Sequence, residues 1–245
     1  TNTYYFNSVS IGGSAVTGTN NTYAFYRSTG TAAVTIRNNI FSNSRSNGVG
    51  TGLHFALGLP VSITGVVSNN NLFYTGGIGG NVGLQVATTR NSLGDWQTNT
   101  SQDAASFYEN VTFVNANGNA TNVNLHVNNV IPTQVESGGF NVGIFDDIDN
   151  DIRFGGGGYA GTGTAADIGA DEDNFGVLDV TPPVITYTPI PNQLILTGPL
   201  LSANIIDNTG VEVTSGTAPR IYYKRTTDAN TFVDNTNATN GWKYV

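Results

Sequence analysis

The 245-residue sequence contains no cysteine and no methionine, and its first lysine is Lys224. The absence of cysteine excludes thiol catalysis and cysteine-ligated zinc, but it does not define the redox compartment, because a long stack of β-strands needs no disulfide bonds. The opening TNTYYF returns as NNTYAF at Asn20–Phe25. With no methionine to start the chain, we expect it to begin within a repeat of a longer protein.

An apolar leader and an apolar run of about 18 residues, long enough to cross a membrane, are also missing. We therefore predict no membrane insertion by this stretch and expect any export signal to lie elsewhere in the parent protein. Charged residues are scarce, at 11% of the chain, and the net charge is −8. This balance disfavours nucleic acid as a partner, because binding phosphate depends on lysine and arginine.

The few acids are unevenly distributed. No Asp or Glu occurs before Asp95, whereas the stretch from Asp95 to Asp179 contains 13 acids and a single basic residue, Arg153. The chain is rich in glycine, asparagine and threonine, which form helices poorly. Its 38% apolar residues recur in short β-branched or aromatic runs, which are sufficient for a core. The composition therefore predicts an all-β protein.

A repeat organises the first half of the chain. Asn7, Asn39 and Asn71 lie 32 residues apart, and apolar residues follow each of them. We assign a fourth copy to Asn110–Phe113, which begins 39 residues after Asn71, and we interpret the insertion NSLGDWQTNTSQD at 91–103 as a loop between coils.

Two further tracks accompany the first. One consists of TYAFY, GLHFA and VGLQVA, beginning at Thr22, Gly52 and Val82 with a spacing of about 30 residues, and continues with VNLHV at Val123–Val127. The other pairs VTIRNN, from Val34, with GVVSNN. Short alternating segments broken by turn residues predict several strands in each period.

Such a unit cannot close a core alone, so we expect the coils to stack as a solenoid with equivalent strands paired in parallel. Asparagine at one place in successive coils suits a tight turn with left-handed backbone, and its amides can bond along the axis. The alternative is that the asparagine pairs are surface turns without function.

The phrases VTIRNNIFSN, VVSNNNLFY and ENVTFVN resemble coils of right-handed parallel β-helix proteins of the pectate-lyase-like class. The segment Asn124–Glu172, with NLHV, PTQVESGG, DIDNDIR and DIGADE in order, is similar to the closing part of such domains in secreted proteins of Bacteroidota. The family phrase is nearer DIDGDPR, so Asn150 and Ile152 depart from it. The resemblance implies a β-helix over residues 1–176 that this segment caps.

The rest of the chain has a different pattern. Residues 177–183 form a linker around Pro182-Pro183, whose rings enforce extended backbone. Beyond it VITYTPIP, LLSANIID, VEV and PRIYYKR alternate with turn signals, as in a β-sandwich. The TPP and IYYK phrases resemble immunoglobulin-like modules of Bacteroidota surface proteins. Residues 184–245 are too few for a complete sandwich, so we expect a truncated one.

No catalytic site is predicted. By resemblance, enzymes on the β-helix scaffold use carboxylates clustered on adjacent coils, or calcium beside a basic residue, and residues 1–94 contain neither an acid nor a lysine. His54 and His126 lie in what the pattern treats as equivalent strands, and neither has a second titratable group nearby in sequence. We interpret both as outward-facing or hydrogen-bonded structural histidines.

The candidate metal site is a structural calcium site at Asp147, Asp149 and Asp151, because alternating aspartates can wrap oxygen ligands around Ca²⁺. Asp146 belongs to the same group, and the next segment can contribute Asp167, Asp171 and Asp173. The alternative is that these acids face solvent or pair with Arg153 while the last coil is capped. No other cofactor is predicted.

Three functions remain open. The resemblance implies a non-catalytic structural or adhesive segment of a large extracellular cell-surface protein, exported by the type 9 secretion system for attachment or gliding. The alternatives are the C-terminal part of a polysaccharide lyase or glycoside hydrolase with catalytic coils upstream, and a carbohydrate-binding module. The expected partners are polysaccharides or surface glycans, and secretion machinery that carries the chain as cargo. Aromatic residues for stacking on sugars are Tyr4, Tyr5, Tyr23, Tyr26, Tyr74, Trp96 and Tyr108, many of which must instead fill the core.

Overall fold

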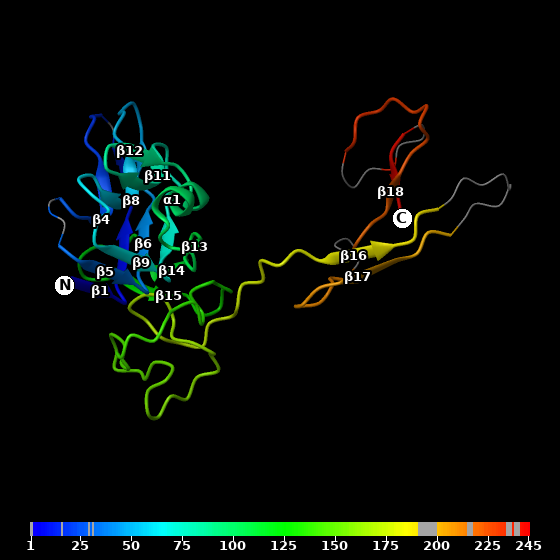
Figure 1. Cartoon of the computed structure of the whole chain (residues 1–245). Coiled ribbons are helices and arrows are strands. Elements are labelled where there is room, and N and C mark those ends of the chain that lie inside the picture. The colour runs from blue at the N-terminus through cyan, green and yellow to red at the C-terminus, as the bar shows by residue number, and fades with distance from the viewer. Residues whose placement is uncertain are drawn as a thin grey trace. The chain divides into compact units, whose positions relative to one another are not determined.

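The computed structural model of the chain describes residues 2–15, 17–28, 30, 32–190, 200–214, 218–233, 237 and 241–245 (Figure 1). It divides into two compact units, Thr1–Leu178 and Asp179–Val245. The first unit is a β-solenoid of roughly three turns with parallel strand pairing, which confirms the predicted parallel β-helix.

Three sheets run along the solenoid, and each takes one strand from successive coils. The first sheet consists of β1 (Asn2–Tyr5), β5 (Val34–Arg37) and β9 (Val66–Asn69). The second consists of β2 (Ser8–Ile11), β6 (Ile40–Asn43), β10 (Leu72–Tyr74) and β13 (Phe107–Tyr108). The third consists of β4 (Thr22–Tyr26), β8 (His54–Leu59), β11 (Gly80–Gln85) and the antiparallel β12 (Thr88–Arg90). A short parallel pair joins β3 (Ser14–Ala15) to β7 (Ser46–Asn47).

The predicted 32-residue period sets the register of the first sheet and of the first three strands of the second, whereas Leu72 pairs with Phe107 of β13 at an offset of 35. Ser8, Ile40 and Leu72 occupy one column of the second sheet. In the first sheet Val34 pairs with Val66, so the predicted alignment of VTIRNN with GVVSNN is wrong by one residue. Parallel stacking at a constant offset places each side chain above its counterpart in the previous coil.

The third sheet departs from the predicted spacing of about 30 residues. Thr22 pairs with His54, an offset of 32, whereas His54 pairs with Gly80, an offset of 26. The VNLHV segment, predicted as the next copy, does not join this sheet. It forms β15 (Asn124–Val127), which pairs antiparallel with β14 (Phe113–Asn115).

The interior of the coils is apolar and continuous. Phe41 stacks on Phe73 of the next coil with ring centroids 6.2 Å apart. Burying one such side chain contributes about 1.5–3 kcal/mol relative to leaving it exposed. The buried members of this inner cluster are Val34, Ile36, Phe41, Ala56, Leu57, Leu59, Val66, Phe73, Val82 and Trp96.

A ladder of side-chain amides runs through the turn between the first and second sheets. Nδ2 of Asn7 donates to Oδ1 of Asn39 at 2.8 Å, and Nδ2 of Asn39 donates to Oδ1 of Asn71 at 2.9 Å. Nδ2 of Asn71 in turn donates to Oδ1 of Asp103 at 3.1 Å, again 32 residues further along the chain. The carboxylate of Asp103 has no hydrogen to pass on, so it ends the ladder. The predicted bonding of stacked amides is confirmed.

The backbone of this turn repeats with the ladder. Asn38 and Asn70, each preceding a ladder residue, have φ angles of 58° and 54°, the left-handed conformation that asparagine tolerates. Asn39 and Asn71 themselves are fully buried, so the alternative of surface turns is wrong for them. In each asparagine pair the first residue therefore forms the turn and the second joins the ladder.

The fourth turn differs from the prediction. Asn110 does not continue the ladder, because Asp103 takes the fourth position and Oγ of Ser106 accepts the backbone N–H of Asn71 at 2.9 Å. The segment 91–103, predicted as a loop, contains the only helix of the described residues, α1 (Leu93–Thr100).

Helix α1 covers the end of the inner cluster. Ser92 caps its first turn by accepting a backbone N–H. Trp96 is fully buried against Gly83 of β11, where a Cβ atom would lie 2.2 Å from the indole ring. The indole Nε1 donates to Asp103 at 2.8 Å, which ties the helix to the end of the ladder. The inserted helix thus closes the last coil.

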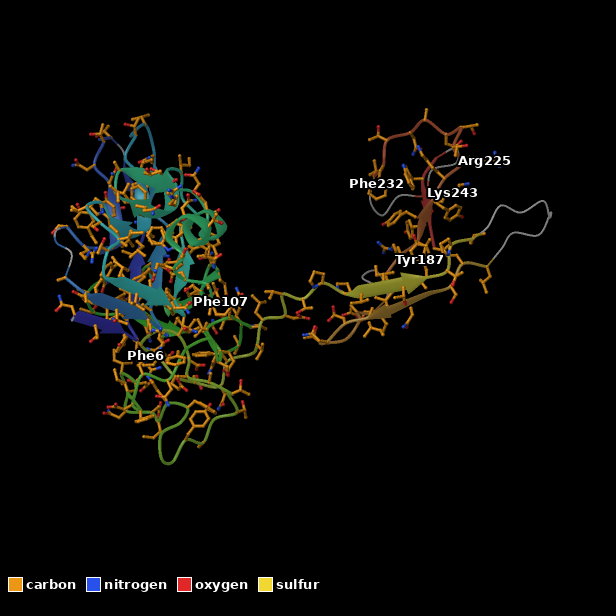
Figure 2. All side chains as sticks on the ribbon, viewed as in Figure 1. Phe6, Phe107, Tyr187, Arg225, Phe232 and Lys243 are labelled. Carbon is orange, nitrogen blue, oxygen red and sulfur yellow. The ribbon has the colours of Figure 1, made fainter. Side chains whose placement is uncertain are left out.

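The residues after the solenoid, 111–175, cover the outer face of its second sheet and are called the covering segment below. Ile40 and Leu72 point away from the inner cluster and are nevertheless fully buried. Phe107, labelled in Figure 2, packs against the same outer cluster. Its buried members are Ile40, Leu72, Val111, Phe113, Val127, Val135, Ile168 and Phe175. A sheet covered on both faces explains why two consecutive apolar residues occur in each of these strands.

This covering segment contacts successive coils along the side of the solenoid. Asn38 in the second coil exchanges hydrogen bonds with the backbone of Phe140, donating to its oxygen at 2.7 Å and accepting from its nitrogen at 2.9 Å. Ser8 in the first coil accepts the backbone N–H of Ala170 at 3.0 Å. The predicted end cap at Asn124–Glu172 is therefore a lateral cover, because its partners lie along the axis.

The second unit contains two antiparallel pairs. Strand β16 (Val184–Tyr187) pairs with β17 (Ala203–Ile206), and β18 (Tyr222–Tyr223) pairs with β19 (Lys243–Tyr244). The predicted strand at Val211–Val213 is not formed. Pro191, the last residue of the predicted strand VITYTPIP, lies outside the described residues.

The ladder generates a stability prediction. Asn39→Ala removes the acceptor for Asn7 and leaves the buried Oδ1 of Asn71 without its side-chain amide donor, so we expect the free energy of unfolding to fall by at least about 2 kcal/mol. Asn7→Ala is the matched control, because Asn7 is exposed at the end of the ladder. Its expected loss is below about 1 kcal/mol. Urea denaturation measures both, and equal losses would contradict the structural role of the ladder.

Candidate functional site

The aspartates of the predicted calcium site lie in one tight turn. Asp146 and Ile152 form an antiparallel bridge that closes it. Oδ1 of Asp147 accepts the backbone N–H groups of Asp149 and Asp151, both at 2.8 Å, and its Oδ2 accepts the N–H of Glu172 at 3.0 Å. Both oxygens of Asp147 therefore hold backbone, while Asp149 and Asp151 extend from the turn and are exposed. Calcium at Asp147, Asp149 and Asp151 stays a prediction.

Arg153 does not form an ion pair with these aspartates. Its guanidinium is fully buried, donates from Nη1 to Glu172 at 3.1 Å and binds the backbone oxygens of Asp146, Gly169 and Ala170. The guanidinium also lies over the ring of Phe6, 4.0 Å from its centroid. Arg153 therefore fixes the covering segment to the first coil of the solenoid.

The buried carboxylates of the covering segment share one pattern. Each accepts at least one backbone N–H, as in the bonds from Asp167 and Phe154 to Glu172 at 2.8 and 2.9 Å. The same pattern holds for Glu136 and Asp171, which accept from Phe175 and Val127. A segment with little regular secondary structure must satisfy its buried amides in this way, because sheet partners are not available.

Asp167 is the most strongly perturbed of these acids. Burial raises its pKa to about 8, and the nearby Glu172 carboxylate adds to the effect. The backbone N–H groups of Ser137 and Asp173, at 2.7 and 3.2 Å, act in the opposite direction because they favour the ionised form. Burial also raises the pKa of Glu172 and Asp171.

His126 brings together residues that are distant in sequence. Its Nε2 contacts Oδ2 of Asp149, 23 residues away. His126, Asp149 and the buried Asp171 offer ligand atoms that all lie within 4.8 Å of one another. The hydrogen bond to Asp149 raises the pKa of His126. The sequence pattern indicates Asp149 and Asp171 as candidate ligands of one ion but does not join His126 to them, because the three residues come from β15, the aspartate turn and the end of the covering segment.

Two surface hollows flank the histidine cluster. One, of about 530 Å³, is lined by Val123, Leu125, Ile148 and other residues, together with His126 and Asp171. The other, of about 390 Å³, is lined by the acids Asp149, Asp151, Asp171, Glu172 and Asp173 together with His126 and neighbouring asparagines. Both hollows therefore reach His126 and Asp171.

His54 occupies a different environment. It is fully buried, and its ring nitrogens lie 2.9 Å from Oγ1 of Thr22 and 3.0 Å from Oδ1 of Asn47. Burial, and secondarily the charge of Arg45, lowers its pKa. The prediction of a hydrogen-bonded structural histidine is confirmed here. The predicted equivalence with His126 is wrong, because the two residues lie in different sheets.

The predicted sugar-stacking aromatics divide by burial. Trp96 is fully buried in the inner cluster and cannot stack on an external ligand. Tyr26 is 48% exposed and lies against Tyr23, with ring centroids 4.5 Å apart. Both rings pack over Gly58, where a Cβ atom would come within 3 Å of each. This tyrosine pair is a ready aromatic surface on the third sheet.

Comparison with models of protein families, with curated proteins and with solved structures finds no match for this chain. Within the described ranges, no helix has the length and apolar character needed to cross a membrane.

The raised pKa of Asp167 predicts a pH dependence. Between about pH 4 and pH 8 the folded state keeps the proton on Asp167 that the unfolded chain has lost. The contribution of this group to the free energy of unfolding is therefore complete below about pH 4 and declines as the pH rises to about 8. The contribution of one proton is at most about 1.4 kcal/mol per pH unit. Urea denaturation at several pH values should show a smaller decline for Asp167→Asn than for the unaltered chain. Parallel declines would contradict the assignment.

Proposed function

We propose that this chain is a non-catalytic structural and adhesive segment of a large secreted cell-surface protein, exported by the type 9 system and used in attachment or gliding. The observation that carries the proposal is the use of its carboxylates. Coils up to Gly94 contain no acid at all, and the buried acids beyond them accept backbone or side-chain N–H and O–H groups. Carboxylates engaged in this way hold the chain together, which supports a structural use of the acids over a hydrolytic one.

The solenoid architecture supports this role. Coils joined by parallel ladders and a continuous core present repeated sheet faces, and stacked repeats of this kind create binding surfaces. In the same proposal the second unit belongs to an immunoglobulin-like β-sandwich. Its support is the antiparallel pair β16 and β17, and an aromatic group in which Phe232 meets Tyr222 and Trp242 edge to face at centroid distances of 5.0 and 5.5 Å.

Glycan binding is the second candidate function, and the pair Tyr23 and Tyr26 favours it. Amphipathic rings that are held rigidly and partly exposed provide contact area at a low entropic cost. Tyr23 is held from below by Phe55, on which it stacks at 5.2 Å. Asn21 donates to the Tyr23 hydroxyl at 3.2 Å and places a polar group beside the rings.

A binding assay with immobilised cell-wall polysaccharides tests the adhesive function. If the tyrosine pair is the contact surface, Tyr26→Ala should weaken binding at least about fivefold, the loss expected from truncating an interface anchor. Tyr187→Ala in the second unit, where the side chain is 62% exposed, is the matched control and should bind normally. Release of reducing ends or unsaturated products by the chain would refute the non-catalytic proposal.

Location provides a separate test. Antibodies against this chain should label intact cells that produce the parent protein, and brief external protease treatment should abolish the label. Deleting the type 9 secretion machinery should move the protein into the cell fraction. Labelling only after cell lysis would overturn the surface assignment.

A further inference from the structure

The cluster of His126, Asp149 and Asp171 has the composition of a metal site. It offers one imidazole nitrogen and two carboxylate oxygens within 4.8 Å of one another. The three residues come from three separate stretches of chain, and each is held in place by groups outside the cluster.

The imidazole of His126 is oriented by Asn124. Oδ1 of Asn124 accepts the backbone N–H of His126 at 2.9 Å, and the same oxygen contacts Nδ1 of the ring. The backbone bond identifies this atom as the acceptor oxygen, so Nδ1 carries the hydrogen that it shares with Asn124. A histidine that donates one ring N–H to a fixed oxygen presents the other nitrogen as a metal ligand. Nε2 points to Asp149.

Asp171 contributes a buried carboxylate with one oxygen available to bind an ion. The residue is 7% exposed, and its Oδ2 accepts the N–H of Val127, next to His126 on β15, at 2.9 Å. Among the described residues no donor contacts its Oδ1. Asp171 lines both hollows beside the cluster, so water can reach the remaining coordination positions of an ion.

The position of Asp149 is set by the aspartate turn. Asp147 accepts its backbone N–H at 2.8 Å and also anchors the turn to Glu172. Asp149 is exposed and lies over His126 at the rim of the second hollow. The turn that was predicted to bind calcium therefore supplies one ligand and supports it with a second carboxylate.

From these contacts we infer that His126, Asp149 and Asp171 bind a divalent first-row transition metal, for which Zn²⁺ is the probe. One nitrogen and two oxygens with open positions suit Zn²⁺, whereas Ca²⁺ takes six to eight oxygen ligands. The ion would join β15, the aspartate turn and the end of the covering segment, and so hold three stretches of the lateral cover together. This site shares Asp149 with the predicted calcium site at Asp147, Asp149 and Asp151 but differs from it in its other two ligands, and it does not depend on the proposed adhesive function.

Titration calorimetry and thermal melting of the whole chain with Zn²⁺ alone test the site. We expect one ion per chain and a rise in melting temperature that EDTA reverses. His126→Ala and Asp171→Asn should each weaken binding at least tenfold, and Asn124→Ala should weaken it with all three ligands retained. Circular dichroism of each variant without metal establishes that it is folded.

The matched control is Asp151→Asn, which removes an exposed acid of the same turn without touching the cluster, and it should bind Zn²⁺ normally. Co²⁺ bound to the unaltered chain should give visible absorption bands that His126→Ala lacks. Three results would overturn the assignment: no saturable Zn²⁺ binding, equal losses for Asp151→Asn and Asp171→Asn, or tighter binding of Ca²⁺ than of Zn²⁺.

Discussion

The hydrogen-bonded ladder from Asn7 to Asp103 is the constraint on which the rest of the first unit depends. Asn7, Asn39 and Asn71 each donate from the side-chain amide to the next coil, and the oxygens of Asn39 and Asn71 accept from the previous one, so a buried polar turn is satisfied without water. The ladder works only if successive coils keep the same offset. It therefore sets the register of the two sheets that meet at this turn, and the columns of the inner cluster follow from that register.

The end of the ladder is also a structural junction. Asp103 receives hydrogen bonds from Ser68, Asn71, Ser106 and Trp96, which join the last complete coil, the start of the fourth and helix α1. Burial raises the pKa of this carboxyl, while those four donors favour its ionised form. An acceptor with several donors suits the last position, because an asparagine there would present an amide without a partner in a further coil.

Beyond the coils, buried backbone amides have different hydrogen-bond partners. The covering segment has little regular secondary structure, and its buried amides bind carboxylates instead of neighbouring strands. Glu172 shows this most clearly, since it accepts from Phe154 and Asp167 and pairs with the buried Arg153. This requirement explains the buried acids Glu136, Asp167, Asp171 and Glu172, and the cluster at His126 lies where three of these anchored stretches meet.

The sequence by itself determined the all-β class, the parallel solenoid and the 32-residue period. A solenoid repeats its contacts at a constant separation, so residues of the same kind recur in the sequence at that separation. Asp103 also lies one 32-residue period after Asn71, although it is not an asparagine and so does not stand out in the repeated pattern. The tertiary structure alone decided the shorter offset at Gly80, the helix around Trp96, the lateral position of the covering segment and the meeting of His126 with Asp149 and Asp171. These features have no period, because each arises from contacts that occur once in the chain and are not repeated from coil to coil.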